Sequence, residues 1–250
     1  MNHRGVRILA FHGIQPNPTN SYAITPSNFE LCMGYLKENF NVIELAEYVK
    51  GIQLGQTFPP GTVILTFDDG FQNFYDLGYP ILKRYRLPAT CFVIASRVDA
   101  NDAEFMHWRE LRGLVKEGLV TIGSHTMSHV SIAGLDDASL LKEVQGAKGF
   151  LESGLGIPVT CFSYPYGTLR DFDCRCIYAV HRSGYASACT SINGVNWRGT
   201  NPFRLRRTKI EWGDDLPAFK KILAGALDIW VAVDCCLCFL QKGREYPWNG

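Results

Sequence analysis

Short runs of apolar and β-branched residues recur along the chain and alternate with longer stretches of helical spacing. Six runs have the length and composition of buried strands: residues 6–11, 63–67, 90–94, 120–122, 159–162 and 186–190. Four stretches carry apolar residues three and four positions apart and are expected to be helices: residues 28–40, 75–86, 108–116 and 138–151. This alternation favours an α/β protein with a mainly parallel sheet.

Polar residues suited to chemistry follow four of the predicted strands. They are His12, the adjacent Asp68 and Asp69, His125 and Tyr166. In α/β barrels the loops at the carboxyl ends of parallel strands meet on one face and build the active site. We therefore expect these residues to lie close together, although they are far apart in the sequence.

Composition narrows the class of protein. The chain has 250 residues, of which 46% are hydrophobic and 20% charged, as in a globular protein with one large domain. A net charge of +1 and the absence of a dense Lys/Arg run give no reason to expect a nucleic-acid partner. The apolar start is short and is interrupted by Arg7, unlike a signal peptide, and nine cysteines fit reduced thiols. We therefore expect a cytoplasmic protein.

The last part of the chain differs in character. Residues 218–240 are predicted to form a helix that continues into the apolar run IWVAVDCCLCFL. We accordingly divide the chain into a barrel over residues 1–216 and a helical tail over residues 217–250. The tail is expected to pack on the barrel; the alternative is a partner surface or a peripheral membrane contact. Cys235 and Cys238 form a CxxC without a second ligand pair, which favours buried thiols over a zinc site.

Two short motifs carry the candidate chemistry. Asp68 and Asp69 close the predicted strand VILTF, although a DDG sequence alone is typical of a turn. In SHTMSH, His125 and His129 would share one face of a helical turn, as ligands for a divalent metal or as two unrelated surface histidines. Taken together, one carboxylate and two imidazoles leave coordination positions open for water, and the second carboxylate can act as general base.

These motifs resemble a known family. The chain resembles the polysaccharide deacetylases of carbohydrate esterase family 4, the NodB-homology proteins. The resemblance is carried by the motifs TFDDG, SHTMSH and a YPYG turn, together with ILAFHGI, YPILKRYRLPATCFV and NPFRLRR. The resemblance covers roughly residues 12–208. It implies a distorted (β/α) barrel with fewer strands than a full TIM barrel, and a metal-dependent amidase that removes acetyl groups from N-acetylated sugars.

The resemblance also implies roles for individual residues. Asp68 matches the general base, and Asp69, His125 and His129 match the metal ligands. Tyr166 matches the residue whose backbone amide helps to bind the tetrahedral oxyanion. Zinc is the default metal, with cobalt, nickel or another divalent ion as alternatives.

The chain departs from the family pattern at two places. Tyr164 stands where many members carry an arginine, so we expect the base to be braced by Arg207 of NPFRLRR instead. The histidine of the family's last motif, often assigned as general acid, has no clear match, and His12 is the candidate substitute.

Several functions stay open from the sequence alone. The expected substrate is an N-acetylated sugar of glycan or glycoside biosynthesis, with a nucleotide or lipid carrier as options. The alternatives are a non-catalytic sugar-binding descendant of the same fold and an amidase acting on a non-sugar C–N bond. The chain has no G-x-S-x-G motif, which disfavours covalent catalysis by serine.

Overall fold

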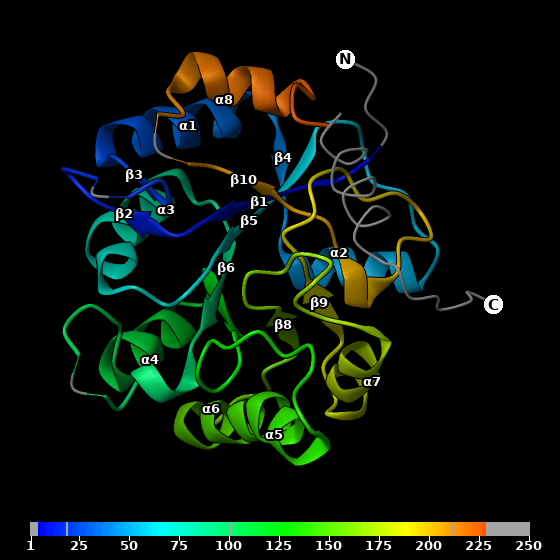
Figure 1. The fold of residues 1–250 in the computed structure, drawn as a ribbon. Helices are drawn as coiled ribbons and strands as arrows, with labels where there is room; N and C mark the ends of the chain where they lie inside the picture. Colours follow the sequence, from blue (N-terminus) through cyan, green and yellow to red (C-terminus); the bar gives the residue numbers. More distant parts are fainter. Residues whose placement is uncertain (1–4, 19, 101, 212, 229–250) are drawn as a thin grey trace.

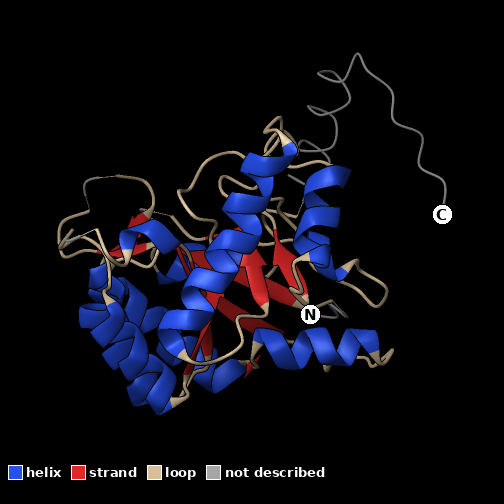
Figure 2. Cartoon of the chain, turned by 90° about the horizontal axis from the view of Figure 1, so that it is seen from below, coloured by secondary structure: helices blue, strands red, loops and turns tan. Residues whose placement is uncertain are grey.

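Parallel strands form a curled sheet at the centre of the molecule, and helices surround it (Figures 1 and 2). The computed structural model describes residues 5–18, 20–100, 102–211 and 213–228. Within these ranges the main sheet has the order β10-β1-β5-β6-β7-β8-β9, and β4 pairs with β5. Its strands are β1 (Arg7–Phe11), β4 (Asn41–Val42), β5 (Thr62–Phe67), β6 (Ala89–Val93), β7 (Val120–Ser124), β8 (Cys161–Ser163), β9 (Ser187–Cys189) and β10 (Thr208–Lys209).

One short segment touches both edges of this sheet. Leu205 pairs with the edge strand β9, because its amide donates to Ala188 O at 3.0 Å and its carbonyl accepts from Thr190 N at 2.8 Å. Three residues later, Thr208 lies in β10 beside Leu9 of β1. The segment therefore closes the sheet into a distorted barrel. This confirms the α/β class and the barrel expected from the sequence.

Helices follow most of the strands and pack on the outside of the barrel. They are α1 (Pro26–Asn39), α2 (Leu45–Gln53), α3 (Tyr79–Tyr85), α4 (Trp108–Glu117), α5 (Asp137–Leu141), α6 (Ala147–Leu155), α7 (Cys174–Arg182) and α8 (Leu216–Leu223). Two predicted helices are interrupted by π-turns, at Phe74–Gly78 and Lys142–Gly146. The first interruption lies beside Pro80, which has no amide N–H to donate to the preceding turn.

The strand alternation assigns side chains to two apolar layers. In β5, Val63, Leu65 and Phe67 pack with the outer helices, whereas Ile64 belongs to the cluster inside the barrel. Since successive side chains of a strand point to opposite faces, Thr66 and the following Asp68 share the inward direction of Ile64. The strand therefore delivers a carboxylate to the mouth of the barrel.

The tail prediction needs a correction. Helix α8 ends at Leu223, not near residue 240, because Gly225 follows with φ +99, a conformation that ends helices. Phe219 and Ile222 of α8 are buried, and α8 lies against α1 (Figure 1). Residues 229–250, with the CxxC and the whole run IWVAVDCCLCFL, lie outside the described residues, so the division into barrel and tail stays a prediction. Among the described residues, none of the helices combines the length and the apolar character that a bilayer crossing requires.

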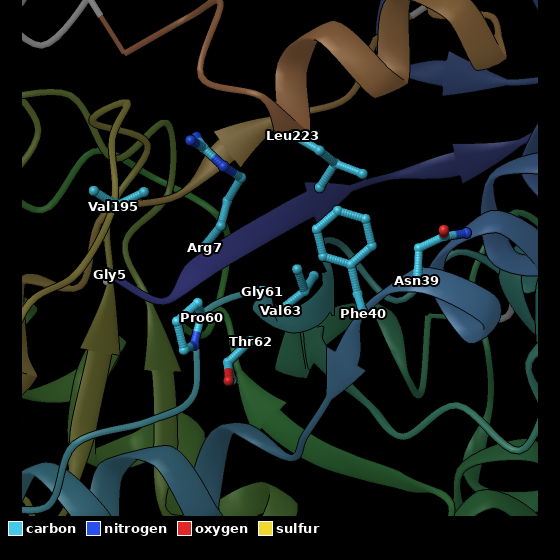
Figure 3. A pocket seen from close by; sticks show the side chains of 10 residues that line it. All are labelled: Gly5, Arg7, Asn39, Phe40, Pro60, Gly61, Thr62, Val63, Val195 and Leu223. Atoms are coloured by element: carbon cyan, nitrogen blue, oxygen red, sulfur yellow. The ribbon is translucent and has the colours of Figure 1, made fainter. Parts of the chain in front are cut away.

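The amino ends of β1 and β5 border a cavity of about 240 Å³ (Figure 3). Arg7 lies at its edge, with a side chain that is nearly buried, and donates to both carboxylate oxygens of Asp228 at 2.8 and 2.9 Å and to Thr208 Oγ1 at 3.0 Å. The cavity is at the end of the barrel opposite Asp68 and His125, which follow the carboxyl ends of β5 and β7. Its lining includes Phe40 and Leu223.

Candidate active site

The two adjacent aspartates stand directly after β5. Asp68 is buried, and its amide donates to Phe11 O at 2.9 Å, which continues the ladder between β5 and β1. Asp69 has φ +72, in the left-handed region that non-glycine residues seldom adopt, and Gly70 follows with φ +77. This turn allows two consecutive carboxylates, which a regular strand would place on opposite faces, to serve the same site.

Arg207 holds the first carboxylate. Its side chain is completely buried and donates to the two oxygens of Asp68 at 2.7 Å each. The remaining guanidinium hydrogens reach Thr190 O at 2.8 Å, Ser163 Oγ at 2.9 Å and Thr66 Oγ1 at 3.3 Å. A bidentate pair with further hydrogen bonds on the cation fixes the carboxylate in one orientation.

Their surroundings give the two carboxyl groups opposite protonation tendencies. Burial alone would raise the pKa of Asp68, but the Arg207 guanidinium outweighs it and holds this pKa well below its usual range. Burial, and after it the charge of Asp68, raise the pKa of Asp69 to about 7. Asp68 is therefore ionised at neutral pH, whereas Asp69 needs a nearby positive charge to be fully ionised.

The two histidines of SHTMSH meet Asp69, but not through a helical turn. His125 follows β7, and His129 lies with φ +60 in the irregular segment between β7 and α5, where its amide donates to Thr126 Oγ1 at 3.0 Å. The Nε2 atoms of His125 and His129 lie 3.6 and 3.3 Å from Asp69 Oδ1. His125 Nδ1 is 2.8 Å from the carbonyl oxygen of Ser163. A carbonyl can only accept, so Nδ1 carries the hydrogen and Nε2 presents its lone pair to the site.

Glu143 supports this loop and was not singled out by sequence reasoning. It lies in the π-turn between α5 and α6 and is buried. Its carboxylate accepts from the amides of Met127 and Ser128 at 3.0 and 2.9 Å and from Ser128 Oγ at 2.6 Å. The sequence signal that could have identified Glu143 is its position among the apolar residues of a predicted helix, because a buried carboxylate requires hydrogen-bond partners.

The three ligand candidates fit a divalent metal ion. One donor atom each from Asp69, His125 and His129 can be chosen so that all lie within 4.8 Å of one another. Asp69 Oδ1 is buried and has no hydrogen-bond partner, a costly situation that a cation would relieve. Two imidazole nitrogens and one carboxylate oxygen form a donor set that suits zinc and related divalent ions.

The other predicted residues also border this cluster. His12, directly after β1, interacts electrostatically with Asp68, and its Nδ1 is buried without a hydrogen-bond partner. Burial lowers the pKa of His12 to about 4, against the charge of Asp68. Tyr166 has φ +59 and a half-exposed side chain, and its ring centroid is 5.0 Å from that of His129.

Phe71 and Trp108 each pack on another aromatic ring. Phe71 stacks on Phe105 with ring centroids 5.2 Å apart, and Trp108 of α4 packs on Phe150 of α6 at 5.3 Å. Trp108 therefore belongs to the helical layer, and Phe71 packs on the segment that precedes α4.

Two bacterial proteins are similar to this chain in sequence. YxkH of Bacillus subtilis (strain 168), a provisionally named polysaccharide deacetylase, is 27% identical over 214 residues, covering 85% of this chain and 74% of YxkH. The poly-β-1,6-N-acetyl-D-glucosamine N-deacetylase of Staphylococcus aureus (strain MRSA252) is 28% identical over 163 residues, covering 60% of this chain. The chain thus spans little more than half of the S. aureus enzyme, whose covered share is 56%.

Solved structures share the fold. The Streptococcus pyogenes deacetylase PplD, in complex with acetate, superposes with a TM-score of 0.79 at 21% identity, covering 88% of this chain and 98% of PplD. IcaB from Ammonifex degensii superposes with a TM-score of 0.77 at 23% identity, covering 89% of this chain and 97% of IcaB. The sequence model of polysaccharide deacetylases matches residues 55–188, more than half of the chain. The chain therefore belongs to the polysaccharide deacetylase family.

Proposed function

We propose that the protein is a metal-dependent hydrolase that removes the N-acetyl group from an acetylated amino sugar. The observation that carries the proposal is the pairing of a possible three-ligand metal site, Asp69, His125 and His129, with a separate carboxylate held by Arg207. Hydrolysis of an amide needs both an electrophile for the carbonyl and a base for water. Membership of the family and the named activity of the S. aureus relative support the same reaction.

When bound, a divalent ion supplies Lewis acidity, which polarises the amide carbonyl and lowers the pKa of water. Asp69, His125 and His129 would hold it, with zinc as the first candidate and cobalt or nickel as alternatives. Asp68 would act as general base toward the water. Because Arg207 keeps Asp68 a weak base, this step depends on a strongly acidified water. The Tyr166 backbone N–H would face the oxyanion.

His12 would complete the reaction as proton donor to the departing amine. In the resting site burial keeps its pKa at about 4, so it is neutral at pH 7 and cannot donate at first. It is nevertheless a stronger base than Asp68, whose pKa lies far below the usual carboxyl range. The proton that Asp68 takes from water can therefore pass to His12 and then to the nitrogen, leaving acetate and a free amino sugar.

The carrier of the sugar and the compartment are further parts of the proposal. A nucleotide- or lipid-linked sugar, a cytoplasmic location and a peripheral membrane contact through the tail remain predictions from the sequence. They are independent of the chemistry at the site, which requires only an N-acetyl group.

The proposal is tested by metal content and acetate release. The purified protein is loaded with zinc or cobalt, its bound metal is quantified by mass spectrometry, and acetate is measured with N-acetylglucosamine oligomers. Asp68→Asn should retain the metal and lose at least about a hundredfold in turnover, the scale of general-base catalysis. Asp99→Asn, at an exposed aspartate, is the matched control and should leave both unchanged. A fully active Asp68→Asn, or acetate release that resists EDTA, would contradict the mechanism.

A further inference from the structure

Lys209 of β10 lies on the inner face of the barrel, at its mouth. β10 runs beside β1, with Thr208 opposite Leu9 and Lys209 opposite Ala10 (Figure 1). Leu9 belongs to the apolar layer beneath the outer helices, so Thr208 shares that direction and the next side chain, Lys209, points into the barrel. Arg207, two residues earlier, has the same inward direction, so Lys209 lies closer than Arg207 to the carboxyl ends of the strands.

This position brings the charge of Lys209 close to the proposed proton donor. His12 comes two residues after Ala10, the β1 residue that pairs with Lys209. Lys209 and His12 interact electrostatically. The lysine is half-buried, as expected for a residue whose apolar stem packs on the barrel while its ammonium group reaches the mouth. The ammonium group is therefore next to the catalytic cluster, on its β1 side.

The part of the chain that the structure describes gives this ammonium group no counter-ion. Among the described residues, none forms a hydrogen bond or an ion pair with the Lys209 side chain. The Asp68 carboxylate is already held by Arg207, and Glu211 is exposed and does not pair with Lys209. A half-buried charge without a partner is unfavourable, so an anion supplied by a ligand would be stabilised here.

The segment after β1 adds no negative charge either. Residues 13–24 follow His12 directly and include β2 (Gly13–Ile14) and β3 (Ala23–Ile24), which pair in a small separate sheet. This segment contains neither Asp nor Glu. The β1 side of the mouth therefore suits an anionic group.

Arg97, on the other side of the cluster, differs from Lys209 in having partners. It follows β6, and its charge acts on His129. Its Nη1 atom lies 3.6 Å from Asp102 Oδ2, and its Cζ atom lies 5.2 Å from the centroid of the Phe105 ring. Arg97 is therefore already stabilised by the protein, which makes Lys209 the better candidate to bind an anion of the substrate.

The structure of the reacting sugar determines which anion can reach Lys209. In a 2-acetamido sugar the amide nitrogen is attached to C2, which is bonded to the anomeric carbon C1. A group that donates a proton to this nitrogen, the role proposed for His12, therefore lies near the substituent on C1. In nucleotide- and lipid-linked sugars this substituent is a phosphoryl group, whereas in a neutral glycan it is a glycosidic oxygen. Lysine binds phosphate as a compact charge with three N–H donors.

We propose that Lys209 is a specificity-determining residue that binds a phosphoryl group on the anomeric carbon, so that the substrate class is a 2-acetamido sugar 1-phosphate or an ester of it. The inference rests on the proposed function for the identity of the reacting amide. It adds the requirement of a negative charge next to that amide, which neither the metal ligands nor the base imposes. A sugar 1-phosphate, a nucleotide-linked sugar and a lipid-linked sugar share this chemistry.

The first test compares charged and neutral substrates in the metal-loaded enzyme. The charged ones are N-acetylglucosamine 1-phosphate, its uridine diphosphate ester and a short-chain prenyl diphosphate ester, which separate the three sources. The neutral ones are the methyl glycoside and the β-1,6-linked pentamer of N-acetylglucosamine. At least one charged substrate should have the highest kcat/KM, and its advantage should decrease with added salt.

Substitutions then assign this preference to Lys209. Lys209→Met should lower the ratio of charged to neutral kcat/KM about five- to twentyfold, mainly through KM, as for a partly exposed ionic hydrogen bond. Lys209→Arg, which keeps the charge, should retain most of the ratio. Lys220→Met, at an exposed lysine of α8 that lies over Tyr35, is the matched control and should leave the ratio unchanged.

A second test measures binding without turnover. EDTA-treated protein is titrated with N-acetylglucosamine 1-phosphate by calorimetry, and Lys209→Met should weaken binding about five- to twentyfold. If no substrate releases acetate but this difference is found, the proposed function fails and the phosphoryl contact stands. Acetate release from neutral substrates only, or unchanged affinity in Lys209→Met, would overturn the inference and leave the proposed function intact. An equal loss of kcat on charged and neutral substrates would show that Lys209 acts on His12 instead, and would also overturn it.

Discussion

Replacing Arg207 with methionine should damage stability and activity together. Methionine keeps the length of the side chain and removes the charge, so the Asp68 carboxylate stays buried without the two hydrogen bonds of 2.7 Å. Thr190 O, Ser163 Oγ and Thr66 Oγ1 lose their donor as well. Breaking a buried pair by removing one partner costs about 3 to 5 kcal/mol. For a chain of this size that corresponds to a decrease in Tm of roughly 6 to 20 °C.

The loss should depend on pH with a definite sign. In the native protein the folded pKa of Asp68 lies below its unfolded value, so its contribution to stability is present above about pH 4. That contribution disappears as the pH falls through the folded pKa. In Arg207→Met, burial without the guanidinium raises the folded pKa above the unfolded one, so stability is lost as the pH rises. The difference between the two proteins should therefore be largest at neutral pH and should shrink as the pH falls below about 4.

Urea unfolding of metal-free protein, followed by circular dichroism at several pH values, measures this difference. Arg206→Met is the matched control, since Arg206 is a half-buried neighbour in the same segment. In a double-mutant cycle with Asp68→Asn, the double variant should be less destabilised than the sum of the single ones. Additive losses, or a loss below about 1 kcal/mol for Arg207→Met, would refute the idea that the pair is a tightly coupled unit.

Three further substitutions or conditions test other parts of the structure. Because the folded pKa of Asp69 is raised to about 7, metal-free protein should lose stability as the pH rises through 7, and zinc affinity, measured by chelator competition, should fall below that pH. Arg7→Met removes the pair with Asp228 far from the site, so the unfolding free energy should decrease by about 1 to 3 kcal/mol while kcat/KM stays within twofold; a large loss of kcat/KM would contradict the separation. Gly167→Ala should cost more stability and activity than Gly118→Ala: both glycines have positive φ, but only at Gly167 would the added Cβ lie 2.6 Å from a backbone nitrogen, and equal melting temperatures would count against this reasoning.

The strands of the barrel were predictable because they are nearly continuous apolar runs. A parallel sheet is covered on both faces, so β1, β5 and β6 contain few polar residues and stand out from their surroundings. β10 has only two residues, Thr208 and Lys209, and nothing in their composition marks a strand. Its position follows from closing the barrel, which is a property of the whole chain.

The identity of the candidate site residues was predictable from the sequence, but their backbone conformation was not. Strand ends and the family motifs pointed to Asp68, Asp69 and His125, and the structure places them together. The positive φ angles of Asp69 and His129 had no signal, because non-glycine residues seldom adopt them and periodicity does not report handedness. Such backbone conformations are concentrated where the surrounding structure compensates for their energy, commonly at functional sites.

The ion pairs of this barrel join residues that are far apart in the chain, which limits how much of the barrel can fold during synthesis. Arg207 comes 139 residues after Asp68, so at about 5 to 20 residues per second it leaves the ribosome roughly 7 to 28 s later. Asp228, which pairs with Arg7, comes 221 residues after it. A nascent chain that ends before Arg207 therefore contains both aspartates and both histidines but no cation for the base and no segment to close the barrel. The protein should therefore become catalytically active only after the barrel closes, so measured activity indicates that folding is complete.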